Sequence, residues 1–461
     1  MANADTVGRP RLTSSTTRQL SPGRSIGLVG AGQALESYDF LLFGLLSPFL
    51  GAQFFGSDPL SGTLNALAVY GVGFVARPFG ALFFGWISDR VGRRPMMLLS
   101  VSIMALSSLL IGLMPTASVM GIWATVALVL LRIVQGLAFG IEAPLNGTYN
   151  VELGKRDRLG WYSGLIASWV QLGLLTASLV AFFTSLALGK ETMGEWGWRI
   201  PFLVGGVLGL FVLVLRRGLP ETLHEKDDEA DDAPLRHARD AHETTITSSI
   251  EPEGAATEGG SRAMWRQIGR HWFSLLAAVF VVGGVQILNY ALLTALPSYA
   301  QAVDSIDPTI AFGVTSGFGL IILILCPIAG RLADRWRFSR FYVVARWLLV
   351  PAIFLLLAYQ GGNIGIYIAI VLVGAVVLSP NLAIFNPIGA SLVPRQGRVT
   401  GSGIAYSVGV ALFGGTASYL YVWLQSIGLV WVFCVYGATI CLLSIFLYQA
   451  AVRRNGLYAG R

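Results

Sequence analysis

Ionisable side chains interrupt several of the long apolar runs of this chain, and their types and spacing could do chemistry. Glu36 and Asp39 are three positions apart in one apolar run, which brings them to one side of a helix. Arg77 lies in the next run, seven positions after Tyr70, so these two are two helical turns apart on one face. An ionisable group inside a membrane costs at least ~2.5–3.5 kcal/mol on insertion scales, so its presence indicates a function.

A further run contains a similar stripe, formed by Gln135, Glu142 and Tyr149. Arg132 in the same run lies about 80° from Glu142 around a helix with 100° per residue, so these two need not touch. A guanidinium is always charged and holds a carboxylate through two parallel hydrogen bonds. We therefore predict that Arg77 binds a carboxylate substrate, with a structural pairing to a neighbouring carboxylate as the alternative.

Asp39 and Glu142 are the predicted proton carriers, and Glu36 is a further candidate for proton coupling. A carboxyl group can take up and release a proton, and substrate and proton could influence each other through Arg77. Each carboxylate could instead be a permanent salt-bridge partner.

The remaining candidate ligands are uncharged. In the second half of the chain they can form hydrogen bonds without changing charge near neutral pH. The first half would then handle the proton and the charged end of the substrate, and the second half its neutral part. Aromatic residues in helix bundles are more often packing than ligands. The predicted substrate ligands besides Arg77 are Tyr38, Tyr70, Trp169, Gln171, Gln286, Asn289, Tyr290, Asn381 and Tyr406.

The elements that must position these residues are membrane-spanning helices. The chain has 461 residues, of which 54% are hydrophobic and 12% charged, whereas a soluble protein is about 25% charged. Its apolar runs are long enough to cross the hydrocarbon core as helices. We predict an all-α membrane protein with twelve spans in two six-helix bundles, at about 25–53, 62–87, 94–114, 119–150, 158–187, 197–217, 268–300, 309–333, 339–358, 364–390, 399–424 and 428–451.

Charge distribution predicts the sidedness and the division of the chain. Of the 32 Lys and Arg residues, only Lys190 falls in a predicted outside loop, so both termini are predicted to be cytoplasmic. Residues 218–267 are rich in acids, Ser, Thr and Gly, a composition that predicts a largely disordered cytoplasmic linker. The predicted order is a tail over 1–24, bundles over 25–217 and 268–451 joined by this linker, and a tail over 452–461.

A short charged turn occurs twice. "GWISDRVGRRP" (85–95) and "GRLADRWRFSR" (330–340) each follow an even-numbered span on the predicted inside. A carboxylate at the end of a helix can accept hydrogen bonds from Arg or from a neighbouring helix N-terminus. We predict a latch that holds the cytoplasmic side shut, with a simple topology anchor as the alternative. Its residues are Gly85, Asp89, Arg90, Gly92, Arg93 and Arg94 in the first copy and Asp334 and Arg335 in the second.

The first copy of this turn resembles the cytoplasmic-loop signature of the major facilitator superfamily. The segments "ESYDFLLFG" (36–44), "RIVQGLAFGIE" (132–142), "GEWGWRIPFLVGG" (194–206) and "LPET" (219–222) make the chain similar to the metabolite:proton symporter family within it. The resemblance implies proton-driven uptake of small metabolites across a prokaryotic cytoplasmic membrane. It also implies a coupling role for Arg132 and a latch role for Glu221. Members usually have Trp at the position of Ser37 and Gly at that of Ile141, so substrate contacts near these positions could differ.

Several functions remain open. A symporter of an organic acid is the main prediction, a symporter of a zwitterion such as proline or betaine is the alternative, and a drug:proton exporter is a third. An enzyme is not expected, because no nucleophile–base set, metal cluster or phosphate loop is present in the sequence. The predicted partners are a small, anionic metabolite, the proton and the lipid bilayer, with no cofactor, no metal and no nucleic acid. The predicted protein is a monomer in the inner (plasma) membrane.

Overall fold

A computed structural model describes residues 22–56, 58–91, 93–153, 158–216, 269–359, 361–393 and 398–455. The side chains of residues 22–29, 85–86, 88–90, 93–94, 141–153, 398–399 and 455 lie outside this description. Every regular element in the described ranges is a helix. The predicted linker over 218–267 lies outside the described residues.

The first half contains α1 (Pro22–Leu45), α2 (Ser47–Phe54), α3 (Pro59–Val91), α4 (Arg93–Leu113), α5 (Ala117–Met120), α6 (Ile122–Leu153), α7 (Leu159–Thr192), η2 (Met193–Gly197) and α8 (Arg199–Arg216). The second half contains α11 (Trp272–Tyr290), η3 (Ala291–Ala295), α12 (Leu296–Ala302), α13 (Pro308–Arg335), α14 (Phe338–Ile353), η4 (Phe354–Ala358), α15 (Ile364–Ser391), α16 (Arg398–Gly409), η5 (Val410–Gly414), α17 (Gly415–Ser426) and α18 (Val430–Asn455).

These helices agree with the twelve predicted spans. Eleven helical stretches of the described residues are long and apolar enough to cross a membrane. The remaining span is α1, a helix of 24 residues that contains Glu36 and Asp39 and packs against α7 and α8. Each predicted span ends within about five residues of the observed helices, because the apolar runs themselves define the bilayer-crossing segments.

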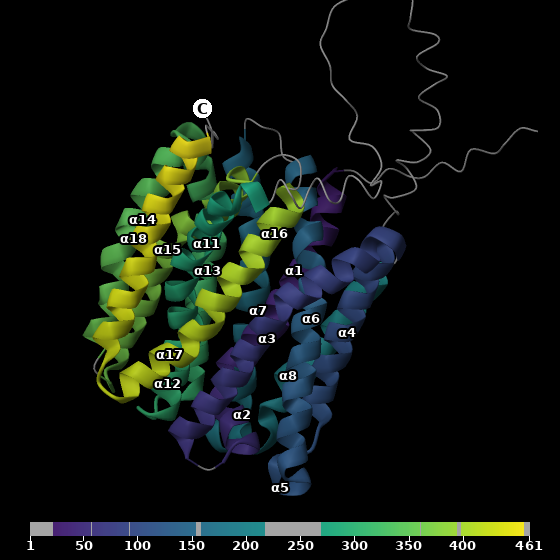
Figure 1. Cartoon of the computed structure of the whole chain (residues 1–461). Helices are drawn as coiled ribbons and strands as arrows, with labels where there is room; N and C mark the ends of the chain where they lie inside the picture. The colour runs from purple at the N-terminus through teal and green to yellow at the C-terminus, as the bar shows by residue number, and fades with distance from the viewer. Residues whose placement is uncertain are drawn as a thin grey trace, which may run out of the picture.

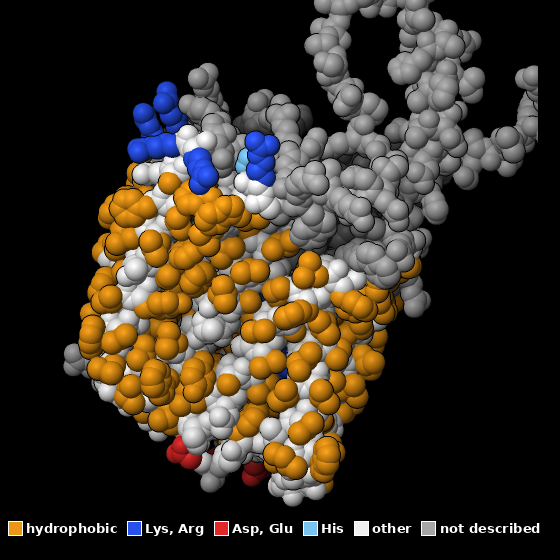
Figure 2. Space-filling model, in the orientation of Figure 1, with side chains coloured by type: hydrophobic (Ala, Val, Ile, Leu, Met, Phe, Trp, Pro, Cys, Tyr) orange, Lys and Arg blue, Asp and Glu red, His pale blue; other side chains and the backbone are white. Residues whose placement is uncertain are grey.

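The helices pack as two halves along a common seam (Figure 1). In the first half α3 packs on α6, α4 on α8 and α1 on α7, and in the second half α11 and α14 pack on α18 and α13 on α15. The longest contact between the halves runs between α7 and α13. A broad hydrophobic surface covers the face of the bundle seen in Figure 2, with Lys and Arg at one end and acids at the opposite end. This pattern is typical of a lipid-facing belt between two aqueous boundaries.

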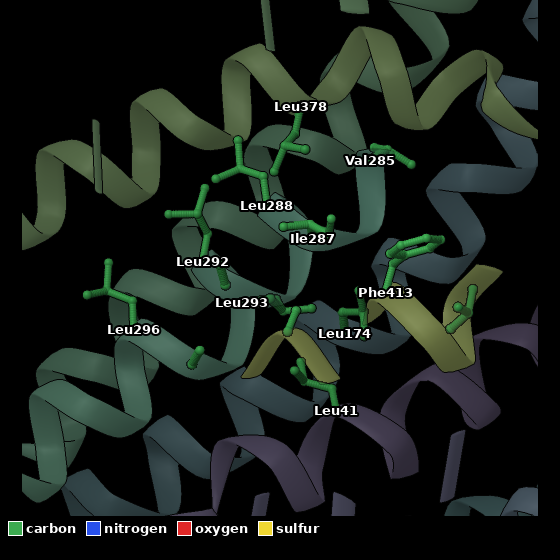
Figure 3. Close-up of a cluster of buried hydrophobic side chains, with 14 of the residues drawn as sticks. Leu41, Leu174, Val285, Ile287, Leu288, Leu292, Leu293, Leu296, Leu378 and Phe413 are labelled. Atoms are coloured by element: carbon green, nitrogen blue, oxygen red, sulfur yellow. The ribbon is translucent and has the colours of Figure 1, made fainter. Parts of the chain in front are cut away.

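Apolar side chains from both halves fill the space between them. Leu41 of α1, Leu174 of α7, Leu288 of α11 and Leu292 of η3 all belong to one cluster of buried hydrophobic side chains (Figure 3). Phe413 of η5 belongs to the same cluster. The polar residues of the candidate site are therefore embedded in an otherwise apolar core.

Candidate functional site

Arg77 lies at the centre of an aromatic cage on the first half. Its side chain is 3% exposed, and its guanidinium carbon is 3.7 Å from the ring centroid of Phe139 and 3.8 Å from that of Phe40. The ring of Phe74 is 4.4 Å away. Ring faces stabilise a cation that has been removed from water. The cage therefore stabilises the positive charge of Arg77 in the interior of the bundle.

The second half also contacts this arginine. Tyr290, the last residue of α11, interacts electrostatically with Arg77. The Tyr290 ring centroid lies 5.0 Å from that of Phe74 and 6.4 Å from that of Tyr70. Tyr406 of α16 interacts with Arg77 electrostatically. Arg77 is thus placed where both halves of the chain meet.

Arg132 on α6 forms a second buried cation next to the first. It is fully buried, and its Nη1 donates a hydrogen bond of 2.9 Å to Oε1 of Gln135. Its guanidinium carbon is 4.2 Å from the ring centroid of Phe43 and 4.7 Å from that of Phe40. Nε and Nη2 find no hydrogen-bond partner among the described residues. Arg132 therefore has donor capacity left for an anion or a water molecule.

Asp39 lies at a junction of three helices of the first half. Its Oδ1 accepts a hydrogen bond of 2.7 Å from Ser108 of α4, and Oδ2 has no partner among the described residues. A Cβ atom on Gly205 of α8 would come within 2.6 Å of Oδ1, so only a glycine leaves room for the carboxylate there. Asp39 also interacts electrostatically with Arg132.

Glu36, one turn earlier on α1, faces a different arginine. It is 2% exposed and interacts electrostatically with Arg77 and with Tyr406 of the second half. Of the two carboxylates of α1, Asp39 thus interacts with Arg132 and Glu36 with Arg77. The third predicted carboxylate, Glu142, falls in α6, but its side chain lies outside the described residues.

The other predicted ligands divide into two groups. Tyr70 belongs to the cage, and its hydroxyl has no hydrogen-bond partner among the described residues. Gln171 is buried with an unpaired Oε1, again counting only described residues. Trp169 packs against Gly30 of α1, and Tyr406 stacks on Phe385 with ring centroids 6.3 Å apart.

Four predicted ligands form hydrogen bonds within their own half of the chain. Tyr38 donates to the carbonyl of Pro201 at 2.7 Å. Asn289 donates to Gln286 at 3.1 Å, and Asn381 donates to the carbonyl of Ala345 at 2.9 Å. The bonds of Tyr38 and Asn381 join neighbouring helices, whereas the bond between Asn289 and Gln286 lies within α11.

The second copy of the charged turn joins the two halves. The backbone amide of Gly160 donates to Oδ1 of Asp334 at 2.6 Å, and that of Trp161 donates to Oδ2 at 2.8 Å. Gly160 and Gly330 touch through their backbones, since a Cβ on either would lie 2.1–2.3 Å from the other's carbonyl oxygen. Arg331 lies 3.7 Å above the ring of Trp161, whereas Arg335 is exposed.

The first copy of the turn covers the end of α3 and the start of α4, but the side chains of its predicted latch residues lie outside the described residues. These residues are Gly85, Asp89, Arg90, Arg93 and Arg94, and the predicted latch residues Gly92 and Glu221 lie outside the described residues altogether. Sequence reasoning missed the cage phenylalanines and Trp161, because aromatic residues in apolar runs resemble ordinary core. Phe74 gave one usable signal, since it precedes Arg77 by three positions and so shares its helix face.

Comparison with known proteins agrees with this fold. The family model of the Major Facilitator Superfamily matches residues 30–416. A crystal structure of the D-xylose-proton symporter superposes with a TM-score of 0.67 at 16% identity, covering 93% of this chain and 97% of that chain. A partially occluded, inward-open structure of the xylose transporter XylE from E. coli gives a TM-score of 0.66 at 16% identity, covering 93% and 99%.

The chain belongs to the major facilitator superfamily, and it is a multi-pass membrane transporter rather than an enzyme. It is 30% identical to the α-ketoglutarate permease of Escherichia coli K12, over 99% of both chains. It is 27% identical to the citrate-proton symporter of Klebsiella pneumoniae, over 84% of this chain and 82% of that protein. The proline/betaine transporter of Salmonella typhimurium is 28% identical, over 87% and 77%. These relatives confirm the resemblance to metabolite:proton symporters.

Proposed function

We propose that this chain takes up a small organic acid together with protons by alternating access. The observation that supports this most is Arg77, a buried guanidinium that is caged by aromatic rings of the first half and interacts electrostatically with Tyr290 of the second half. A carboxylate can bind to such a group through two parallel hydrogen bonds. The names of the α-ketoglutarate permease and the citrate-proton symporter agree with a carboxylate substrate.

Proton coupling is assigned to the carboxylates of α1 and α6. Asp39 is buried beside Arg132 and keeps one oxygen without a partner among the described residues. Glu36 and Glu142 are the further candidates, and Arg132 would link their charge state to the substrate site. A proton that neutralises such a carboxylate removes a charge that must otherwise be stabilised inside the bundle.

A zwitterion such as proline or betaine is the second candidate substrate. Its carboxylate could bind Arg77 in the same way, and the rings of Tyr70 and Tyr290 offer faces for a cationic nitrogen. The proline/betaine transporters among the relatives support this alternative. Both candidate substrates would therefore bind Arg77 through a carboxylate. They would differ in the groups that contact the rest of the substrate molecule.

We also propose a location in the inner membrane with both termini in the cytoplasm, and a monomer as the working unit. The gathering of Lys and Arg at one end of the bundle supports this orientation (Figure 2). A twelve-span bundle can enclose its own pathway, so no partner subunit is needed to form one.

Uptake into vesicles tests the proposed function. Purified protein is reconstituted, and labelled α-ketoglutarate, citrate, proline and betaine are offered with and without an inward proton gradient. We expect an acid to accumulate only with the gradient. A preference for betaine or proline over both acids would favour the second candidate, and uptake that ignores the gradient would contradict proton coupling. Vesicles that contain Arg77→Ala protein provide the control for binding at the proposed site.

A further inference from the structure

Arg346 of α14 is a buried cation that the proposed transport mechanism does not use. Its side chain is fully buried, and Nη2 donates a hydrogen bond of 2.8 Å to the backbone carbonyl of Val281 on α11. Nε and Nη1 have no hydrogen-bond partner among the described residues. An ionisable group within a membrane-spanning segment is costly and indicates a function. The guanidinium therefore has donors available for a further ligand.

Neutral groups from three helices form the niche around this guanidinium. A Cβ on Gly284 of α11 would lie 2.6 Å from Nη1 and 3.2 Å from the hydroxyl oxygen of Ser444 on α18. The hydroxyl of Tyr342 on α14 is 3.4 Å from that of Ser444, and its ring centroid is 5.2 Å from the guanidinium carbon. The thiol of Cys441 donates to the carbonyl of Gly284 at 2.9 Å. Tyr342 and Cys441 also interact with Arg346, but a hydroxyl and a thiol bring no negative charge.

The helices around Arg346 supply no carboxylate either. α14 packs on α13, α15 and α18, and Arg346 bonds to α11. Within the described ranges of α11, α14, α15 and α18, the sequence contains neither Asp nor Glu. The one acid of α13 is Asp334, whose two oxygens accept the amides of Gly160 and Trp161. A buried charge without a counter-charge is strongly destabilising, so the counter-charge of Arg346 has to come from outside these helices.

The fold itself does not require an arginine at this place. The two copies of the charged turn begin at 85 and 330, which is a separation of 245 positions, and α4 and α14 begin at 93 and 338, with the same separation. Val101 of α4 therefore corresponds to Arg346. It is fully buried and packs in one apolar cluster with Leu35 of α1 and Val212 of α8. A valine satisfies the packing of these three spans in the first half, so the arginine of the second half indicates a role beyond packing.

We infer that the Arg346 niche binds a small inorganic anion, of the size and charge of chloride. Such an anion supplies the missing counter-charge and accepts hydrogen bonds from Nε and Nη1, and the hydroxyls of Tyr342 and Ser444 are further donors beside it. The side chain is fully buried and the room beside Gly284 is narrow, which favours a single atom over a lipid phosphate. This inference goes beyond the proposed function and does not depend on which substrate is carried.

Thermal unfolding of the purified full-length protein in detergent tests this site. Chloride replaces gluconate stepwise at fixed pH and fixed ionic strength. We expect the unfolding midpoint of the native protein to rise saturably by at least about 2 °C, because a ligand that binds the folded state stabilises it. Arg346→Met should lose this response. In gluconate it should unfold no lower than the native protein, because an apolar residue in place of a buried charge is often neutral or stabilising.

Arg199→Met is the matched control. Arg199 also donates to backbone carbonyls, those of Gly112 and Met114, but it is only partly buried. This variant should keep the native response to chloride. Equal midpoints of the native protein in chloride and gluconate would overturn the inference, and so would an equal shift in Arg346→Met, which would indicate a general salt effect. If Arg346→Met does not fold, Arg346→Gln is measured by the same criterion. Unfolding is measured without substrate, so a failed transport assay would be a separate result.

Discussion

The Asp334 carboxylate accepts a hydrogen bond of 2.6 Å from the backbone amide of Gly160 on the opposite half of the protein. A second bond of 2.8 Å comes from the amide of the next residue, Trp161. The first amides of a helix have no partner within it and form its positive end. Asp334 of α13 therefore caps α7, which gives the carboxylate of the repeated turn a physical role in joining the two halves.

Removal of this carboxylate should loosen the start of α7. In Asp334→Ala the amides of Gly160 and Trp161 lose a charged acceptor, and such bonds are worth about 1.5–3 kcal/mol each. We expect their hydrogen exchange to accelerate at least tenfold, measured by mass spectrometry on the detergent-solubilised protein. Asp307→Ala is the control, because Asp307 caps the other end of α13 through Thr309. Unchanged exchange in Asp334→Ala would contradict the latch.

The close backbone contact between α7 and α13 should not tolerate a methyl group. In Gly160→Ala the new Cβ would lie 2.3 Å from the carbonyl oxygen of Gly330, and such overpacking costs about 1–3 kcal/mol. We expect a lower thermal unfolding temperature for this variant. Gly389→Ala on α15 is the control, because no heavy atom lies within 4 Å of its Cβ position. Equal effects of the two substitutions would show that the contact has no special importance.

Lysine at position 77 should not restore the transport function of Arg77. A lysine keeps the positive charge but lacks the planar fork that binds a carboxylate at two points and stacks on aromatic rings. We expect Arg77→Lys to lower kcat/KM for acid uptake about 10–100-fold, and Arg77→Ala to lower it further. Arg199→Lys serves as the comparison, since Arg199 donates to the carbonyls of Gly112 and Met114 and lies 4.5 Å from the ring centroid of Trp198, a residue outside the Arg77 cage. Near-native uptake by Arg77→Lys would rule out two-point binding.

Neutral replacements should separate proton coupling from substrate binding. We expect Asp39→Asn or Glu142→Gln to retain substrate exchange while losing gradient-driven accumulation, because an amide cannot carry the proton. Both processes are measured on the same vesicles with labelled substrate. Accumulation that persists in both variants would remove both residues as proton carriers.

The sequence was sufficient to predict the helices and the family. Apolar length alone defines a span, so even span seven was found although η3 interrupts it. The turn around Asp334 was predicted as a latch from its Gly and Asp residues. Its partners were not, because nothing in the sequence near Gly160 indicates which helix end will receive a carboxylate 174 positions away.

The candidate site was only partly predictable. Arg77 and Arg132 were evident as charges in apolar runs, but their aromatic neighbours were indistinguishable from core. Glu36 and Asp39 were expected together because they are three positions apart. That spacing still leaves about 60° between them around the helix, which is enough to direct each toward a different arginine.

Movement of protons in response to substrate tests proton-coupled acid transport most directly. Vesicles that contain the protein and a pH dye in the lumen receive external α-ketoglutarate, with no proton gradient imposed. The account predicts that the lumen becomes acidic as the acid enters, and that Arg77→Ala vesicles and protein-free vesicles stay unchanged. Entry of labelled α-ketoglutarate through the protein without any acidification of the lumen would contradict it.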